Sequence, residues 1–566
     1  MDKFLYSQWM DNLPDKDKQT VIAYSDDNRR IAFLKYLDFG TGGMRGKLGI
    51  GPNMVNKYVA NKLAGGIADY LNAKSSSGKP KVVIAYDNRY ESREIAASME
   101  NHLANDGINV EVLKDSNPTP LLAFSVNEIK ADLGIMITAS HNSKEYNGIK
   151  LYNSKGIQLV PQEAKEIRKY YLKCDRDIFH EQKVHRLTNR QSPTIAVMHH
   201  YLEKVNYTLS SILGYQGDKI KDLRVVFSPL HGVAGQMVSQ LANLRGFKNF
   251  YIVEGQYEPD PSFHTIRVPN PEDSSSFEEG LKLAKNVTAD IVICTDADGD
   301  RVGVAVRDND MYSILDGNQL AILLTFFICN LSMQEECSNV IFKTIVTSNL
   351  VERIASARGV TVINTLTGFK YIGNSISQLP KDTRFLLAVE ESNGYLVGDY
   401  LRDKDGILGS LLVMEMVQYY KNSGKNIIDI LKLIYEEYGY YFDRKFQAPI
   451  EKNQIESIEK LKLRIENRLV THIAGKRIDY INGLRLNLDI ENDLGKMSFV
   501  EDIFKNQNDI LYLSLSDGSW ICIRPSGTEP KIKLYVETKG ANKEEAKKLS
   551  EEIEMSFFNL MKECEC

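Results

Sequence analysis

The feature that most constrains the fold is a pattern that occurs three times along the chain. In each copy an apolar strand ends in a polar loop, a helix follows and stops at a glycine, and a second strand comes next. After a gap, a late apolar strand ends in another polar loop. Strands that alternate with helices predict β-α-β units and a mainly parallel sheet. The expected first strands are 81–86, 223–228 and 339–346, the helices end at Gly107, Gly246 and Gly359, and the late strands are 133–137, 289–294 and 384–389.

The last part of the chain has a different pattern. From about Tyr441 we expect a helix (455–469), short strands, a strand at 531–537 and a closing helix from about Asn542, which favours an α+β domain. A chain of 566 residues is too long for a single core. The predicted class is therefore α/β, with three similar α/β domains, whose sheets are mixed and largely parallel, and a C-terminal α+β domain around a central cleft. The expected domains are 1–210, 211–318, 319–440 and 441–566.

The composition is typical of a globular protein, with 43% apolar and 26% charged residues. The net charge of −5 argues against nucleic-acid binding, which usually needs a basic excess. We expect no secretory signal, because no basic segment followed by an apolar one opens the chain. The longest apolar stretch, 320–329, is too short to span a bilayer and predicts a buried helix. The seven cysteines form neither a CxxC pair nor a disulfide framework, which favours a reducing cytoplasm.

A possible nucleophile follows the first late strand, in the segment 138–142. Ser140 leaves a buried strand in a polar turn beside His141, and Lys150 follows closely enough to fold back on it. A serine beside a potential base can attack or carry a transferred group. No G-x-S-x-G pattern surrounds it, which argues against an α/β-hydrolase.

Three alternating carboxylates, Asp296, Asp298 and Asp300, follow the second late strand. Carboxylates this close would repel one another without a cation, and oxygen ligands favour a hard ion such as Mg²⁺. An EF-hand is excluded, because Arg301 and Arg307 occupy the positions where that loop requires glycine and glutamate.

Two loops have the composition of anion-binding sites. In one, arginine offers a bidentate fork, hydroxyls donate, and glycine lets backbone N–H groups approach a phosphate. Its residues are Arg524, Ser526, Gly527 and Thr528, with charge added by Lys531 and Lys533. The other, 40–46, is glycine-rich and brings Arg45 toward an anion. It matches neither a dinucleotide fingerprint nor a Walker loop, so direct use of ATP is not expected.

The third late strand ends in residues that suit sugar hydroxyls. The Glu390 carboxylate accepts two hydrogen bonds, as a vicinal diol requires, and Ser392 lies two residues further. Lys404, on the following loop, adds a cation. With the serine, the aspartates and the anion-binding loops, these residues indicate phosphoryl transfer on a phosphorylated sugar.

In this order, the motifs resemble those of the α-D-phosphohexomutase superfamily over nearly the whole chain. They are Thr-Ala-Ser-His-Asn at 138–142, Asp-x-Asp-x-Asp-Arg at 296–301, Glu-Glu-Ser-Asn-Gly at 390–394 and Arg-Pro-Ser-Gly-Thr at 524–528. The sequence is most similar to the long phosphoglucomutase and phosphopentomutase branch, through the segments 39–46, 87–89, 367–370 and 402–406.

The resemblance implies a mechanism. Ser140 would be a phosphoserine in the resting enzyme, and Mg²⁺ would be bound by the three aspartates together with an oxygen at Ser140. The serine phosphate would pass to a sugar monophosphate, and glucose 1,6-bisphosphate would be both the intermediate and the activator. The other phosphate of that intermediate would return to Ser140, inside a cleft that a mobile last domain closes.

The resemblance also implies roles for individual residues. His141 and Lys150 are possible general acids or bases, with Lys404 as a further cation, and which of them moves the proton stays open. Arg45 and Arg301 would stabilise the transferring phosphoryl group. The sugar would be held by Thr367, Gly368, Glu390 and Ser392, and the non-transferred phosphate by Arg524, Ser526, Gly527, Thr528 and Lys533.

The leading hypothesis is interconversion of glucose 1-phosphate and glucose 6-phosphate in the cytoplasm, with small sugar phosphates as the only expected partners. A phosphopentomutase or a phosphomannomutase needs the same motifs and remains an alternative. A catalytically silent sugar-phosphate binder would have lost the serine or an aspartate, and none is lost. A hydrolase that releases phosphate from the phosphoserine is a third possibility. The sequence does not specify the oligomeric state.

Overall fold

The computed structural model of the protein describes residues 1–40, 42–75, 78–180, 194–214, 221–331, 338–449, 452–482, 484–485, 510–525 and 531–565. The chain forms two compact units, each built from three stretches of sequence. The first unit is Met1–Asp316, Gly373–Leu379 and Ser392–Lys421, and the second is Gly317–Ile372, Pro380–Glu391 and Asn422–Cys566.

The first sheet of the first unit has the strand order β1-β5-β4-β2-β3. β2 pairs in parallel with both β3 and β4, whereas β4 with β5 and β5 with β1 are antiparallel. The central strand β4 is buried at every position, as expected for an apolar strand that is covered on both faces. The strands are β1 (Gly43–Lys47), β2 (Lys81–Tyr86), β3 (Asn109–Val112), β4 (Leu133–Ile137) and β5 (Tyr146–Asn153).

The second sheet repeats the arrangement of four of these strands, with the order β10-β9-β8-β6-β7. Its antiparallel edge strand β10 follows the other four in sequence, whereas β1 precedes them. β6 pairs in parallel with β7 and β8, and β8 with β9 and β9 with β10 are antiparallel. β8, like β4, is buried throughout. The strands are β6 (Arg224–Ser228), β7 (Asn249–Ile252), β8 (Ile291–Thr295), β9 (Val302–Asp308) and β10 (Met311–Leu315).

Amphipathic helices cover these sheets and bury their apolar sides in separate cores. In the first core, Trp9 is fully buried against Phe33 and Tyr58. The strand β14 (Gly394–Val397) also belongs to this unit. Its helices are α1 (Lys3–Asn12), α2 (Asp15–Ile22), α3 (Asp26–Ala32), α4 (Lys57–Lys74), α5 (Ser92–Asn105), α6 (Thr119–Glu128), α7 (Pro161–Lys173), α8 (Thr194–Leu213), α9 (Gly235–Leu244), α10 (Glu254–Tyr257), the 3₁₀ helix η1 (Ser274–Phe277), α11 (Glu278–Val287) and α15 (Gly406–Asn422).

In the second unit, β11 (Ser338–Thr344) pairs in parallel with β12 (Thr361–Thr365) and with β13 (Thr383–Glu390). The apolar stretch predicted to be a buried helix lies in α12 and is buried. The helices here are α12 (Gly317–Leu331), α13 (Leu350–Ser356) and α16 (Ile427–Tyr438). α14 (Phe369–Ile376) begins in this unit and ends in the Gly373–Leu379 stretch of the first unit. In the described part of the chain, no helix is long and apolar enough to cross a membrane.

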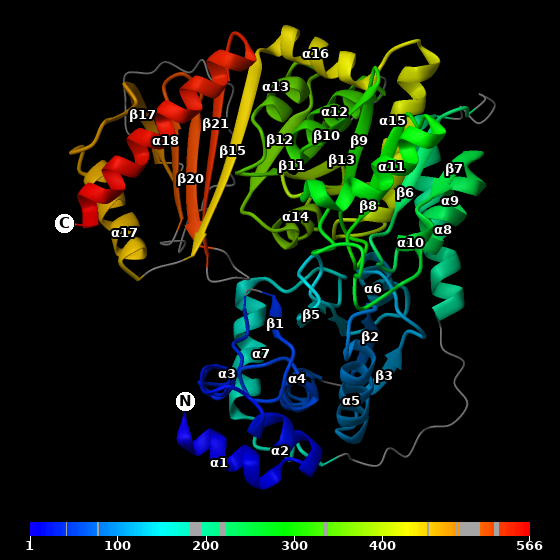
Figure 1. The fold of residues 1–566 in the computed structure, drawn as a ribbon, viewed down its shortest axis with the longest axis vertical. Helices are drawn as coiled ribbons and strands as arrows, with labels where there is room; N and C mark the ends of the chain where they lie inside the picture. The colour runs from blue at the N-terminus through cyan, green and yellow to red at the C-terminus, as the bar shows by residue number, and fades with distance from the viewer. Residues whose placement is uncertain are drawn as a thin grey trace. The chain divides into compact units, whose positions relative to one another are not determined.

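The C-terminal part of this unit is an antiparallel sheet with the order β15-β21-β20-β19-β17-β16, and β18 pairs with β17. In Figure 1, α18 (red) crosses one face of this sheet, with α17 beside it. The elements are β15 (Tyr440–Pro449), α17 (Lys452–Glu466), β16 (His472–Ile473), β17 (Lys476–Ile481), β18 (Leu484–Arg485), β19 (Leu511–Leu515), β20 (Trp520–Pro525), β21 (Lys531–Gly540) and α18 (Lys543–Glu565).

The predicted fold class, three mixed α/β sheets followed by an α+β domain, is confirmed. The glycine-terminated helices end where expected, since α5, α9 and α13 each stop shortly before their glycine. At Gly107, Gly246 and Gly359 the backbone has φ values of +84°, +80° and +69°, which glycine adopts at little cost.

Candidate active site

Ser140 lies in the loop after β4 and is buried, with 2% of its surface exposed. Its φ of +52° is left-handed, an uncommon conformation for a residue other than glycine. The Ser140 N–H donates to Thr138 Oγ1 over 2.8 Å, and its hydroxyl donates to Asp296 Oδ2 over 2.8 Å. His141 Nδ1 lies 3.4 Å from Ser140 Oγ. The hydroxyl therefore points at a carboxylate, with an imidazole beside it.

Asp296, Asp298 and Asp300 follow β8 and are fully buried. One ligand atom from each lies within 4.8 Å of the others. Asp296 Oδ1 accepts the backbone N–H groups of Asp300 and Arg301, both over 3.0 Å, which fixes the turn. Among the described residues, Asp298 Oδ1 and Asp300 Oδ1 have no hydrogen-bond partner.

Buried carboxylate oxygens without partners are costly unless a cation neutralises them. Burial, and then the charges of Asp300 and Asp298, raise the pKa of Asp296 well above its usual range. Three clustered carboxylates next to a serine oxygen form an all-oxygen donor set, which hard divalent cations prefer. The residues present therefore fit a divalent metal ion.

Lys150 lies on β5, opposite Met136 of β4, and its side chain reaches the aspartates that follow β8. Its Nζ is 2.7 Å from Asp298 Oδ2 and 3.2 Å from Asp300 Oδ2. Burial opposes its charge, but the two carboxylates outweigh burial and raise the pKa of Lys150. Burial also opposes the charge of Asp298, which by itself would raise the pKa of that carboxyl. The Lys150 charge nevertheless holds the pKa of Asp298 far below its usual range.

Three further cations surround the same carboxylates. Lys404 Nζ lies 3.1 Å from Asp300 Oδ2. Arg301 Nε lies 3.8 Å from Asp300 Oδ1, and its Nη1 lies 2.9 Å from Glu272. Arg45, on β1, donates to Asn142 Oδ1 over 3.1 Å. The first unit thus brings together the serine, the histidine, the aspartates and all four predicted cations.

Sequence reasoning missed Arg89, whose buried guanidinium holds the serine loop. It donates to the carbonyl oxygens of Ser140, Asn142 (2.6 Å), Ser143 (2.9 Å) and Tyr146 (3.1 Å). Its Nε faces Asp87 Oδ2 at 3.2 Å, with both side chains fully buried. A signal for this role was present, because 87–89 is the loop directly after β2, which pairs in parallel with β4, so both loops leave the same edge of the sheet.

The predicted sugar-binding residues are divided between the units. In the second unit, Gly368 N–H donates to Glu390 Oε1 over 3.0 Å, and Thr367 adjoins this contact. Lys370 follows on α14, and burial lowers its pKa to about 8 although Glu390 opposes the shift. Ser392 belongs to the first unit.

Arg524, also predicted to bind phosphate, is the second-last residue of β20 in the second unit. It donates to Tyr535 Oη over 3.0 Å and lies over that ring, 5.5 Å from its centroid. Lys533 is its register partner on β21, so two cations flank this end of the strand pair. Ser526, Gly527 and Thr528 lie outside the described residues.

Comparison with known proteins agrees with this architecture. Four family models match in order: Phosphoglucomutase/phosphomannomutase, alpha/beta/alpha domains I (residues 37–177), II (199–309) and III (316–438), and the C-terminal domain (486–555). Together with the buried serine and the acidic triad, they define the class of the protein as the α-D-phosphohexomutase superfamily.

Curated relatives and solved structures give more detail. A phosphoglucomutase of Staphylococcus aureus strain N315 is 35% identical over 558 residues, covering 95% of this chain and 96% of the relative, and that of strain MRSA252 is 36% identical over 533 residues, covering 91% and 92%. Within the superfamily, the chain belongs to the phosphoglucomutase/phosphomannomutase family.

Two solved structures share the fold. A phosphoglucomutase/phosphomannomutase family protein from Burkholderia thailandensis is 18% identical with a TM-score of 0.67, over 93% of this chain and 97% of that one. The open form of pp63/parafusin, a phosphoglucomutase from Paramecium, is 18% identical with a TM-score of 0.62, over 93% and 94%.

Proposed function

We propose that the protein interconverts glucose 1-phosphate and glucose 6-phosphate, with Ser140 as the phosphate carrier. The observation that carries the proposal is the buried Ser140 hydroxyl, 2.8 Å from one carboxylate of a three-aspartate cluster and surrounded by lysine and arginine side chains. The Staphylococcus aureus relatives, which are named phosphoglucomutases, support the choice of glucose.

In the proposed reaction the bond from Ser140 Oγ to phosphorus breaks, and phosphorus bonds to the free hydroxyl oxygen of the sugar phosphate. The hydroxyl proton passes to a base, for which His141 is the candidate, because the carboxylates that raise the pKa of Lys150 keep its amine protonated. Lys150 is therefore the candidate acid that protonates the Ser140 oxygen as it leaves. Arg45, Arg301 and Lys404 offset the charge of the transferring group. The glucose 1,6-bisphosphate so formed turns over, and its other phosphate returns to Ser140, which leaves the isomeric monophosphate.

We propose that Asp296, Asp298 and Asp300 hold Mg²⁺, with Ser140 contributing an oxygen ligand. When bound, the ion supplies Lewis-acid stabilisation of phosphoryl oxygens. Glu390, Ser392, Thr367 and Gly368 are proposed to bind the sugar. Arg524, Ser526, Gly527, Thr528 and Lys533 are proposed to bind the phosphate that is not transferred.

The domain boundaries 1–210, 211–318, 319–440 and 441–566 are part of this proposal, as are closure of the last domain over the substrate and a cytoplasmic location. This division suits the mechanism, because each domain contributes a different loop. The four loops carry Ser140, the three aspartates, the proposed sugar-binding residues and the proposed phosphate-binding residues.

Turnover of glucose 1-phosphate, mannose 1-phosphate and ribose 1-phosphate by the purified protein tests the substrate. We expect glucose 1-phosphate to have the highest kcat/KM. A strong preference for ribose 1-phosphate or mannose 1-phosphate would instead identify a phosphopentomutase or a phosphomannomutase, and steady release of inorganic phosphate would identify a hydrolase.

Replacing Ser140 with alanine tests the carrier. The S140A protein should lose at least roughly three orders of magnitude in kcat, because no acceptor for the phosphate remains. Intact mass should show one added phosphate on the native chain and none on the variant. Full activity of S140A would contradict the phosphoserine mechanism.

A further inference from the structure

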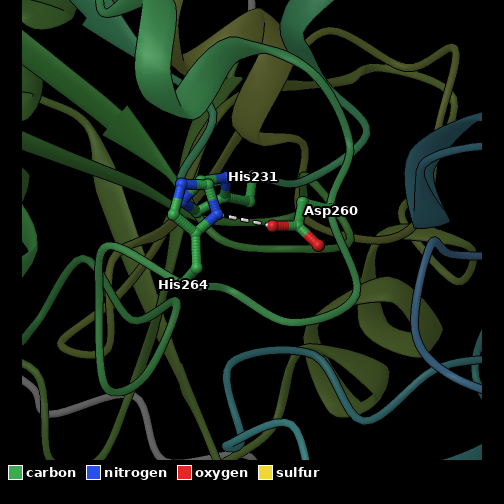
Figure 2. A group of neighbouring side chains, drawn as sticks. All are labelled: His231, Asp260 and His264. Atoms are coloured by element: carbon green, nitrogen blue, oxygen red, sulfur yellow. Dashed lines mark hydrogen bonds and ion pairs between the residues drawn. The ribbon is translucent and has the colours of Figure 1, made fainter.

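A second cluster of metal-ligating side chains lies in the first unit, outside the active site. His231 follows β6, while Asp260 and His264 lie on the segment between α10 and η1. One ligand atom from each lies within 4.8 Å of the others. Figure 2 shows the two imidazole rings side by side, with the Asp260 carboxylate facing His264. The ring centroids are 4.6 Å apart, and His264 Nδ1 lies 2.6 Å from Asp260 Oδ2.

We propose that His231, Asp260 and His264 bind one divalent cation of the zinc class, at a site separate from the acidic triad. Two imidazoles and one carboxylate form a nitrogen-rich donor set that suits Zn²⁺, whereas the all-oxygen triad suits Mg²⁺. Three protein ligands leave coordination positions for water. The two sites of this chain therefore select different metals by donor type.

The cluster has the outer-shell support that metal-binding histidines usually have. His231 Nε2 lies 2.8 Å from Thr265 Oγ1, to which Gln256 Nε2 also donates over 2.8 Å. Gln256 Oε1 in turn accepts from Ser228 Oγ over 2.7 Å, at the end of β6. This chain of hydrogen bonds fixes the buried His231 ring, so one ligand is held in place before the metal arrives.

The other two ligands give the cation a route from solvent. The side chain of His264 is 61% exposed and that of Asp260 is 30% exposed. Asp260 is also positioned by its own loop, because its carboxylate accepts the backbone N–H and the hydroxyl of Ser262 over 2.9 and 2.7 Å. The site thus combines a fixed inner ligand with two accessible outer ones.

The proposed site adjoins the residues that hold the phosphoserine loop. Asn88 Nδ2 donates to the carbonyl oxygen of His231 over 2.8 Å. The Arg89 guanidinium lies 5.1 Å from the centroid of the Phe263 ring, one residue before His264. A bound cation would join the His231 loop, which Asn88 contacts, to the 260–264 loop, which Arg89 contacts through Phe263. Its occupancy is therefore expected to order the support of Ser140.

The experiment uses the full-length protein, stripped of metal by a chelator and with any affinity tag removed. Zn²⁺ is titrated by calorimetry in saturating Mg²⁺, which occupies the triad. We expect one Zn²⁺ per chain, and X-ray absorption at the zinc edge should show two imidazole ligands. Zinc bound at the triad alone would give oxygen ligands only and would overturn the proposal.

Variants of the exposed ligands complete the test without disturbing the core. H264A and D260N should each weaken Zn²⁺ binding by more than the roughly 10–100-fold that loss of an outer-shell partner costs. The matched control is H180A, because His180 forms a similar exposed pair with Asp177, also at 2.6 Å, but lies in no described three-ligand cluster. Equal Zn²⁺ affinity in H264A and the native chain, or an equal loss in H180A, would overturn the assignment.

Discussion

At the scale of single residues, Ser140 is held in a backbone conformation that serine seldom adopts. A residue in the left-handed region costs about 1–3 kcal/mol and persists only where its surroundings determine it. Here Thr138 accepts the Ser140 N–H, and Arg89 holds four carbonyl oxygens of the same loop. The direction of the Ser140 hydroxyl therefore depends on Arg89, which contacts the backbone of the loop and not the hydroxyl itself.

Replacing Arg89 with lysine tests this positioning role. Lysine keeps the charge but cannot span four carbonyl groups with a planar fork. A displacement of about 1 Å at the serine would lower kcat roughly 100-fold, with a smaller change in KM. Steady-state kinetics measure the two constants separately. Arg93→Lys, at an exposed position on α5, is the matched control, and an equal loss in both variants would contradict the role.

The lowered pKa of Lys370 predicts that the folding stability of the chain depends on pH. Its pKa is about 8 in the folded chain and 10.5 ordinarily, because burial disfavours the charge. Below pH 8 both states are protonated and the folded state carries the full cost of burying a cation. As pH rises from about 8 to 10.5, the folded state loses its proton first, so stability increases.

Comparison with the Lys370→Met variant isolates the contribution of Lys370 to the pH dependence of folding stability. Between pH 8 and 10.5 the native chain should gain up to about 3 kcal/mol relative to this variant in denaturant unfolding. Lys381→Met, at an exposed position, should show no such difference. Parallel stability curves for the native chain and Lys370→Met would rule out the depressed pKa.

At the scale of elements, the site depends on the antiparallel strand β5 lying between β4 and β1. β4 delivers Ser140, β5 delivers Lys150, and β1 delivers Arg45. β1 can approach this closely only because it begins with a glycine: a Cβ at Gly43 would lie 2.1 Å from the Ile149 carbonyl oxygen. The absence of a side chain at Gly43 thus permits the close spacing of the strands that carry Arg45 and Lys150.

Gly43→Ala should therefore push β1 away from β5. Overpacking of this kind typically costs about 1–3 kcal/mol, and activity should fall as well, because Arg45 moves with the strand. Thermal unfolding and kinetics measure the two effects. Gly255→Ala on α10 is the matched control, since a Cβ there meets nothing within 4 Å. Unchanged melting of Gly43→Ala would show that the strand pair tolerates the extra atom.

The elements that deliver the site were predictable because their signals are local. The strands expected at 81–86 and 133–137 are β2 and β4, residue for residue, since continuous apolar runs between polar loops are bounded clearly. The left-handed φ of Ser140 and the four-carbonyl grip of Arg89 were not predictable, because they arise from contacts 51–57 residues apart in sequence. The motifs predicted that the serine and the aspartates share one site. The distances between Ser140 and the aspartates could be known only from the folded structure.

At the scale of the whole molecule, we expect the proposed activity to depend on a metal at the acidic triad. Removing divalent ions with a chelator should lower activity by at least about 1000-fold, because three buried carboxylates then repel one another and the transferring group. Mg²⁺ should restore it. Intact mass should show that Ser140 keeps its phosphate throughout, and full activity in the chelator would contradict the role given to the triad.

The two units are interleaved along the chain, and this has a consequence for synthesis on the ribosome. The first unit takes its last stretch from Ser392–Lys421, which includes Lys404, the partner of Asp300. The serine and the aspartates are translated long before that lysine, so the nascent chain exposes an incomplete cluster of buried charges until residue 421 has emerged. No single break in the gene would yield two fragments that each contain one whole unit, because the first unit ends at Lys421 whereas the second begins at Gly317.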